Sequence, residues 1–312
     1  MGHPFVSDLE KKMQQYIDCL KHILENGVDS DNRTGIGTKS VFGYQMRFNL
    51  QDGFPAVTTK KLAWRAVVGE LLWFLEGSTD ERRLAELTHK SKYGTVTIWS
   101  ANAEAAYWKP KAKFEGDLGN VYGYQWRNWE KYKEIDTDAD GVIRATKTRI
   151  DQVTDLINAI KNDPYSRRHL LTAWNVSDLD KMALPPCHFV AQFYVRNNTL
   201  SCMMTQRSCD VGLGMNFNHA SYALLMHIIA RECGLQVGEF IHSIGDAHIY
   251  NDHIEGVQEI ITRKPYPPPT LKIDESFDLM DRLQNGFRIG DVDLFRLENY
   301  QHHPTVKMKM AV

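Results

Sequence analysis

Several features that mark secreted, membrane-bound or metal-binding proteins are scarce in this sequence. Its 312 residues contain only five cysteines, an odd number without a CxxC pair, so we expect neither a disulfide framework nor a zinc site. No stretch approaches the roughly 18 apolar residues that a membrane span needs, and residues 1–8 lack the basic and then apolar run of a signal peptide. We therefore expect a cytoplasmic protein without a membrane partner.

Charge of one sign is also scarce. The formal net charge is −2, so no global basic field would hold nucleic acid, and we do not expect a nucleic-acid partner. The sequence has no glycine-rich phosphate loop followed by Lys-Ser or Lys-Thr. His248 and His253 do not provide the clustered ligands of a metal site, so we expect no metal. With 43% hydrophobic and 24% charged residues, the chain has an ordinary globular composition and enough length for a large core.

Hydrophobic periodicity predicts a mixture of helices and strands. The predicted helices cover residues 9–26, 64–75, 150–162 and 220–233, and the predicted strands cover residues 41–50, 96–99, 169–174, 189–195, 200–205 and 240–250. Two polar segments interrupt the pattern. We expect an irregular insertion near residues 100–116 and a solvated loop or mobile insert near residues 130–148. Because no repeat or linker divides the chain, we predict one α+β (mixed α/β) domain over residues 1–312.

The strongest chemical signal is the stretch Leu184-Pro185-Pro186-Cys187-His188, in which two prolines stiffen the backbone before a thiol. The two predicted strands that follow are joined by Arg196-Asn197-Asn198-Thr199, and asparagine tolerates the positive φ of a tight hairpin. Such a hairpin would set Arg207 beside Cys187, where a cation lowers the pKa of a thiol. Cys187 is therefore a candidate nucleophile, although a lone cysteine is commonly just a small buried residue.

For each of the other polar candidates, the sequence alone allows two interpretations. Glu70, at the margin of an apolar helix face, is either a boundary residue in water or a desolvated acid with a raised pKa. Arg167 and Arg168 are either solvated or a bidentate grip on phosphate or carboxylate. The polar loop over residues 31–38, which contains Arg33, is either an anion-binding loop or a surface turn. Arginines together with a thiol suggest covalent catalysis on a small phosphorylated electrophile.

Several separate segments, taken in order, resemble the folate-dependent, cysteine-using thymidylate synthases, from Asn32-Arg33-Thr34-Gly35 to Ala311-Val312. The other matching segments are Glu70-Leu71-Leu72-Trp73-Phe74-Leu75, Thr97-Ile98-Trp99, Ser166-Arg167-Arg168, Pro186-Cys187-His188, Gln206-Arg207-Ser208-Cys209-Asp210, Phe217-Asn218 and Gly245-Asp246-Ala247-His248-Ile249-Tyr250. The resemblance implies a large mixed sheet flanked by helices. Pyrimidine-nucleotide hydroxymethylases share this superfamily, so the resemblance alone leaves the product open.

The resemblance implies a methyltransferase that moves a one-carbon unit from 5,10-methylenetetrahydrofolate to C5 of dUMP, giving dTMP and dihydrofolate. Catalytic roles would belong to Cys187, Glu70, Tyr122, Asn218, Asp210 and Arg207. The nucleotide would contact Arg33, Arg167, Arg168, His188, Gln206, Ser208, Cys209, Asn218, His248 and Tyr250, with Arg167 and Arg168 contributed by the second subunit of a homodimer. The folate would contact Lys60, Trp99, Asn102, Leu184, Asp210, Gly214, Phe217 and Val312.

The sequence departs from the family pattern at four polar positions: Ser100, Thr205, Asn216 and His219. Polar side chains near the site could organise water, which would give a hydroxymethyl product and leave tetrahydrofolate unoxidised without altering base choice. Neutral replacement is the other interpretation, and Trp99 is retained. A third hypothesis is an RNA-binding or regulatory protein without turnover, against which the full set of catalytic residue types argues.

Overall fold

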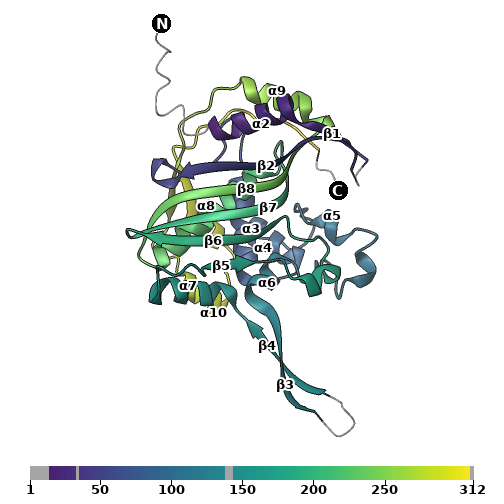
Figure 1. The fold of residues 1–312 in the computed structure, drawn as a ribbon, viewed down its shortest axis with the longest axis vertical. Helices are drawn as coiled ribbons and strands as arrows, with labels where there is room; N and C mark the ends of the chain where they lie inside the picture. Colours follow the sequence, from purple (N-terminus) through teal and green to yellow (C-terminus); the bar gives the residue numbers. More distant parts are fainter. Residues whose placement is uncertain (1–13, 33–34, 138–142, 310–312) are drawn as a thin grey trace.

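The computed structural model describes residues 14–32, 35–137 and 143–309, so the predicted roles of Arg33 and Val312 lie outside the described residues. Its centre is a six-stranded sheet in the order β1-β2-β8-β7-β6-β5, in which only the pair β7 and β8 is parallel (Figure 1). The strands are β1 Val28–Ser30, β2 Thr38–Asn49, β5 Leu170–Thr172, β6 His188–Arg196, β7 Thr199–Asp210 and β8 Gln236–Tyr250. The predicted mixed α/β fold with one large mixed sheet is confirmed.

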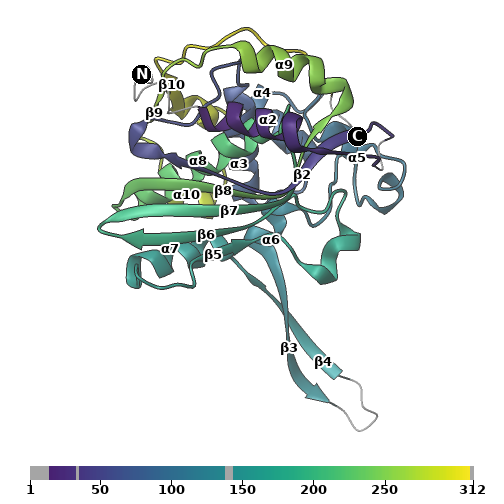
Figure 2. The ribbon, with the colours of Figure 1, turned by 45° about the horizontal axis from the view of Figure 1, so that its top comes forward.

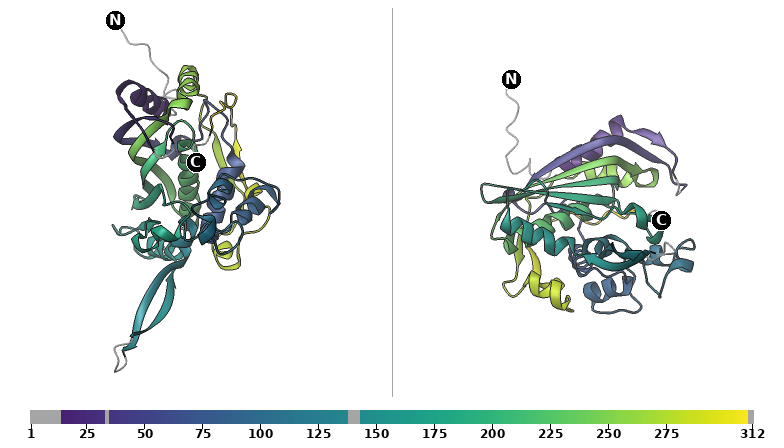
Figure 3. Two further views of the ribbon diagram at one scale, coloured as in Figure 1. Left: turned by 90° about the vertical axis from the view of Figure 1, so that its right-hand side faces the viewer. Right: turned by 60° about the horizontal axis from the view of Figure 1, so that its bottom comes forward.

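The helices pack mainly behind the sheet in the view of Figure 1, and Figure 3 shows the arrangement from the side. They are α2 Gln14–Asn26, α3 Trp64–Glu76, α4 Glu81–His89, α5 Ser100–Ala103, α6 Tyr122–Asn128, α7 Gln152–Asn162, α8 Met215–Glu232, α9 Ile254–Thr262 and α10 Leu279–Asn285. Helix α8 is buried on nearly all sides because it contacts β7, β8 and α3. It therefore forms the middle of the hydrophobic core.

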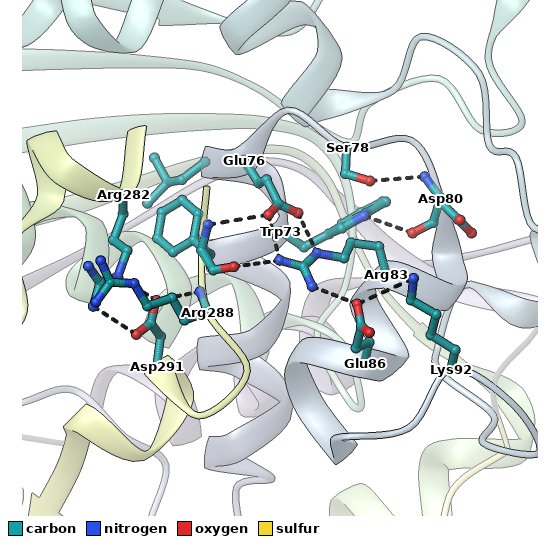
Figure 4. Close-up of polar contacts among 12 residues, drawn as sticks. Trp73, Glu76, Ser78, Asp80, Arg83, Glu86, Lys92, Arg282, Arg288 and Asp291 are labelled. Atoms are coloured by element: carbon teal, nitrogen blue, oxygen red, sulfur yellow. Dashed lines mark hydrogen bonds and ion pairs between the residues drawn. The ribbon is translucent and has the colours of Figure 1, made fainter. Parts of the chain in front are cut away.

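Helix α3 is held firmly at its C-terminal end. Gly77 ends it with a left-handed φ of 75°, a conformation that side chains with a Cβ disfavour. Figure 4 shows Arg83 of α4 donating to Glu76 of α3 at 2.8 and 2.7 Å and to Glu86 at 2.6 Å. The same guanidinium donates to the carbonyl of Phe287 at 2.5 Å. These bonds tie α3, α4 and the C-terminal region together.

The tight hairpin predicted after the proline pair is confirmed. Asn197 and Asn198 have φ of 50° and 58°, which suits a two-residue turn between twisted antiparallel strands. The register pairs His188 with Gln206. It also brings the backbone N–H of Arg207 within 2.8 Å of the carbonyl of Cys187. The two-residue turn and the register that it sets therefore place Arg207 beside Cys187.

One face of the sheet is incompletely covered. Alternate residues of β6 and β7 are buried, and those between them remain partly exposed. A cross-strand row on this outer face runs through Gln192, Met203, Ile241 and Arg47, none of which is fully buried. Such a half-covered sheet can bind a further layer.

Two segments differ from the sequence prediction. The expected loop near 130–148 contains an antiparallel ribbon of β3 Trp129–Thr137 and β4 Ile143–Ile150, which projects from the body (Figures 1 and 2). Its exposed side chains lie in water rather than on the core, so the sequence shows no alternation of apolar residues. The prediction of a strand at 96–99 is wrong, because this segment is a turn into α5.

The insertion near 100–116 is irregular, as expected, and holds α5 and the 3-10 helix Lys109–Lys111. It is anchored by the buried Trp108, whose indole N–H donates to the carbonyl of Asp117 at 2.7 Å. Two short strands, β9 Thr270–Ile273 and β10 Phe295–Glu298, pair near the C-terminal end of the described chain. None of the described helices is long and apolar enough to cross a membrane.

Candidate active site

The thiol of Cys187 lies at the start of β6 and is only partly exposed. The Arg207 Nη2 atom is 3.6 Å from Cys187 Sγ. The same guanidinium donates to the carbonyls of Pro185 and Pro186, each at 2.9 Å. The prolines therefore do more than stiffen the chain: their carbonyls orient the arginine toward the thiol. The backbone N–H of Cys187 donates to Tyr122 Oη at 2.7 Å.

The pKa of the Cys187 thiol runs opposite to the expected direction. Burial raises it, and this effect outweighs the lowering by the Arg207 guanidinium and by Tyr122. The contact with Arg207 is present as predicted, but burial, which tertiary packing sets, has the larger effect on the pKa of the thiol. In the protein by itself, Cys187 is therefore held mainly as a thiol at neutral pH.

A layer of aromatic rings supports the thiol. The ring of Tyr122 stacks on His188 at 4.3 Å between centroids and lies 4.9 Å from Phe74. His188 Nδ1 is 3.0 Å from Tyr222 Oη, and burial lowers the pKa of His188 to about 3. His188 is consequently neutral at physiological pH and acts as a fixed dipole and packing surface rather than as a charge.

The sequence left Glu70 as either a boundary residue in water or a desolvated acid, and in the structure it is the desolvated acid. It is only 7% exposed, and Trp99 Nε1 donates to Glu70 Oε1 at 2.8 Å. Burial raises the pKa of Glu70 to about 7. The carboxyl group adjoins a cavity of about 100 Å³, whose other lining residues include Ile98 and Phe217. An acid with this pKa can hold or release a proton at neutral pH beside an apolar cavity.

From the raised pKa of Glu70 we predict how the free energy of unfolding depends on pH. Since its folded pKa of about 7 exceeds the ordinary 4.5, its stabilising contribution is complete below pH ~4.5 and is lost as pH rises through 7. Glu70→Gln has no such loss. We expect wild type to lose roughly 3 kcal/mol, at most, relative to Glu70→Gln between pH 4.5 and pH 8. Urea unfolding of both proteins at several pH values measures the difference, and Glu255→Gln, at an exposed position, is the matched control. Parallel stability curves would contradict the assignment.

The amide of Asn218 on α8 points toward β7. Gln206 Nε2 donates to Asn218 Oδ1 at 3.1 Å and to the carbonyl of Ser208 at 3.0 Å. Gln206 is only 3% exposed, so these bonds are shielded from water. A side-chain amide held in this way can read the hydrogen-bonding edge of a planar ring.

A second polar group lies where β7 ends. Asp210 Oδ1 accepts from the backbone N–H of Leu213 at 3.0 Å and is 3.7 Å from His253 Nδ1. The buried Lys60 donates to the carbonyl of Gly212 at 2.6 Å, and burial lowers its pKa to about 8. The turn after β7 leads directly into α8. Phe217, near the start of α8, lines the cavity beside Glu70.

Comparison with known proteins agrees with this geometry. The family model described as thymidylate synthase matches residues 14–312. The chain belongs to the thymidylate synthase family. It is 46% identical over 309 residues to a bifunctional dihydrofolate reductase-thymidylate synthase of Paramecium tetraurelia, covering 98% of this chain and 62% of that protein. It is 46% identical over 302 residues to the protein of that name from Zea mays, covering 96% of this chain and 54% of that protein. The chain thus spans little more than half the length of these relatives.

The residues that the thymidylate synthase resemblance assigns to the nucleotide come largely from β7 and β8. Parallel pairing sets Ser208 opposite Asp246 and Asp210 opposite His248. The His248 and Tyr250 rings are 5.2 Å apart at the end of β8. Cys209 has a side chain buried in the core, so a nucleotide contact there would involve its backbone.

Other assigned residues lie farther out. Arg167 and Arg168 are exposed on the loop between α7 and β5, and the structure does not gather them with Cys187 through any bond among the described residues. Asn102 on α5 and Leu184 before the proline pair are half-buried. No group of three His, Cys, Asp or Glu side chains in the described part of the chain could hold a metal ion.

Sequence reasoning did not select two buried partners of the site. Tyr222 binds His188, and His242 binds Gln206 with 3.0 Å between His242 Nε2 and Gln206 Oε1. Tyr222 lies one helical turn after Asn218, a spacing that places both on one face of α8. His242 could not be found in this way, because its contact joins two strands that are far apart in the sequence.

Proposed function

We propose that this chain catalyses the reductive methylation of dUMP at C5 with 5,10-methylenetetrahydrofolate, giving dTMP and dihydrofolate. The observation that carries the proposal is the Cys187 thiol, 3.6 Å from Arg207 and supported by Tyr122. The Tyr122 ring also lies 5.9 Å from the ring of Trp99, which donates to Glu70, an acid with a pKa of about 7. Membership of the thymidylate synthase family supports it. The cavity beside Glu70 is lined by Phe217, one of the residues that the resemblance assigns to the folate.

The residues account for the chemistry that this reaction needs. The sulfur of Cys187 forms a bond to C6 of dUMP, and the electron pair moves to C5 and O4. The Arg207 guanidinium can pair with the negative charge of a phosphate or an enolate. Its positive charge also favours the thiolate form of Cys187 over the thiol. C5 then forms a bond to the methylene carbon of the cosubstrate, and one of that carbon's two bonds to folate nitrogen breaks. Glu70 exchanges a proton near O4. Loss of the C5 proton, which Tyr122 assists, breaks the second carbon–nitrogen bond and leaves an exocyclic methylene at C5. Hydride transfer from the released tetrahydrofolate reduces this methylene to the methyl group as the bond between sulfur and C6 breaks, which regenerates Cys187 and leaves dihydrofolate.

The hydroxymethyl alternative is not favoured. Ser100 Oγ bonds to Glu81 and accepts from the backbone N–H of Thr97, so this hydroxyl is already engaged. His219 is bonded within the core, with 2.7 Å between its Nε2 and His242 Nδ1. Trp99 is 5% exposed and shields Glu70. Ser100 and His219 therefore bond to protein groups rather than organising water, which supports methylation.

An assay of the full chain separates the hypotheses. Incubation with dUMP and 5,10-methylenetetrahydrofolate is expected to raise absorbance in the dihydrofolate band, with dTMP identified by mass spectrometry. Hydroxymethyl-dUMP without an absorbance rise would identify the hydroxymethylase. Absence of tritium release from C5-labelled dUMP would favour a protein without turnover.

We also propose that the chain works as a homodimer through the uncovered sheet face. Met203 and Ile241 lie partly exposed in one cross-strand row of that face. The Gln192 amide of the same row donates to the carbonyl of Arg167 at 3.5 Å. The exposed Arg167 and Arg168 therefore flank this face, from which they can reach the phosphate site of a second subunit.

Mixing two inactive variants tests the shared site. Cys187→Ser lacks the nucleophile, and Arg168→Ala lacks a phosphate ligand for its partner. Random exchange should restore about a quarter of wild-type activity, because half of the dimers then carry one intact site of two. Activity after unfolding and refolding the mixture measures it, and each variant refolded alone is the control. A fully active monomer in sedimentation would refute the proposal.

We further propose one catalytic domain and a cytoplasmic location. The buried apolar residues of the described chain form one continuous core, without a second cluster that would mark another domain. All five cysteines are free thiols in the structure. Free thiols persist in a reducing compartment, which supports the location.

A further inference from the structure

A chain of hydrogen bonds starts at Asn218 and runs through Gln206 and His242 to His219. Gln206 Nε2 is 3.1 Å from Asn218 Oδ1, and Gln206 Oε1 is 3.0 Å from His242 Nε2. His242 Nδ1 is in turn 2.7 Å from His219 Nε2. Gln206, His242 and His219 are 3%, 0% and 2% exposed, so water does not compete for these bonds.

The backbone carbonyl of Ser208 determines which atom donates and which accepts in every bond of this chain. The oxygen of Ser208 can only accept, so the Gln206 atom 3.0 Å away must be its NH₂ group. Gln206 Nε2 then faces Asn218, and the Asn218 atom that meets it must be the carbonyl Oδ1. Gln206 Oε1 must receive a proton from His242 Nε2.

The same logic extends to His219. A His242 that carries its proton on Nε2 accepts at Nδ1, so His219 must donate from its own Nε2. Burial keeps both rings neutral by lowering the pKa of His219 to about 3 and that of His242 well below its usual value. Phe48 packs edge-on against the His219 ring at 4.7 Å between centroids and holds it in place.

A fixed orientation matters because an amide can read either pyrimidine. With Oδ1 toward N3–H and Nδ2 toward O4, Asn218 matches uracil. Turned by 180°, the same side chain would offer Nδ2 to N3 and Oδ1 to the amino group of cytosine. An asparagine therefore selects uracil only if something prevents this turn.

We propose that His242, anchored by His219, is a positioning residue that makes the site selective for uracil over cytosine by fixing the amides of Gln206 and then Asn218. This inference rests on the proposed function and names its base specificity. From sequence alone, His219 was assigned to the fate of the intermediate and not to base choice; the hydrogen-bond chain connects it to base choice instead.

The test compares dUMP and dCMP binding to the full chain by calorimetry. His242→Phe keeps a ring but removes the donor to Gln206, and we expect the ratio of dCMP to dUMP dissociation constants to fall about tenfold. His242→Gln retains an N–H donor and should stay within about twofold of wild type. His219→Leu removes only the anchor and should lower the ratio about threefold, which also tests the idea if His242→Phe does not fold.

A merely structural role would weaken both nucleotides equally and leave the ratio unchanged. An unchanged ratio in folded His242→Phe and His219→Leu, or an equal loss in His242→Gln, would overturn the proposal. So would a wild-type protein that binds both nucleotides equally. Because binding is measured without turnover, a wild type that prefers dUMP but forms no dTMP would contradict the proposed function and leave this inference standing.

Discussion

Cys187→Ser is expected to lose turnover by a factor of about a thousand or more while still binding dUMP. A serine hydroxyl has a pKa far above that of a thiol, so it does not supply an anion at neutral pH. The thiol itself is buried enough to have a raised pKa, which makes the serine still less reactive. Arg207 is expected to keep its bonds to Pro185 and Pro186 in the variant, so the proposed phosphate site should remain. Steady-state rates and calorimetric binding of dUMP measure the two quantities.

Cys233→Ser is the matched control. This thiol is half-buried and lies 3.9 Å from the carbonyl of Ile157, away from the proposed site. We expect near-wild-type turnover from the control. Near-normal turnover in Cys187→Ser would remove Cys187 from the mechanism, and loss of dUMP binding would show that the thiol has a structural role instead.

Asn218→Asp is expected to exchange the base preference, with weaker turnover of dUMP and increased activity on dCMP. A carboxylate offers two acceptors, which match the amino group and the N3–H of a cytosine that carries the shared proton on N3. Uracil instead presents its O4 acceptor to a carboxylate oxygen, so it is mismatched. Each mismatched buried polar group costs roughly 1–3 kcal/mol, so the ratio of kcat/KM for the two bases should shift by a factor of about 100 or more.

Competition kinetics with both nucleotides in one reaction measures this ratio directly. Asn216→Ser is the control, since Asn216 is buried against Tyr16 and, two residues before Asn218, does not share its face of α8. It should leave the base preference unchanged. A wild-type preference for dCMP, or an Asn218→Asp variant with unaltered selectivity, would show that base recognition lies elsewhere.

The prediction for Asn218→Asp depends on the hydrogen-bond chain that runs from Asn218 through Gln206 to His242 and His219. In the proposed site the Asn218 amide would read the base, and its hydrogen bond to Gln206, which His242 contacts in turn, would set the way that amide faces. In Asn218→Asp, Gln206 Nε2 can still donate to the oxygen that faces N3, which keeps this oxygen an acceptor for the N3–H of a protonated cytosine. The combined variant of Asn218→Asp with His242→Phe should therefore discriminate between the bases less sharply than Asn218→Asp alone.

Sequence reasoning succeeded where the signal is local. The period of apolar residues in α3 identified the helix and put Glu70 at its margin. Two asparagines at the turn predicted the hairpin, and the hairpin length then brought Arg207 to Cys187. These features depend on neighbouring residues, whose spacing is visible in the chain itself.

The structure decided what depends on surroundings. The ribbon of β3 and β4 lies in water, and without a buried face its strands leave no alternating pattern. The pKa values of Cys187 and Glu70 rise because packing removes both groups from water, and burial of that kind cannot be read from a single segment. The sequence by itself determined most of the core elements, the hairpin and the candidate nucleophile, because helix period, turn residues and prolines act over a few residues. Only the tertiary structure joined His219, His242 and Gln206, because their bonds connect α8, β8 and β7 across one dry core.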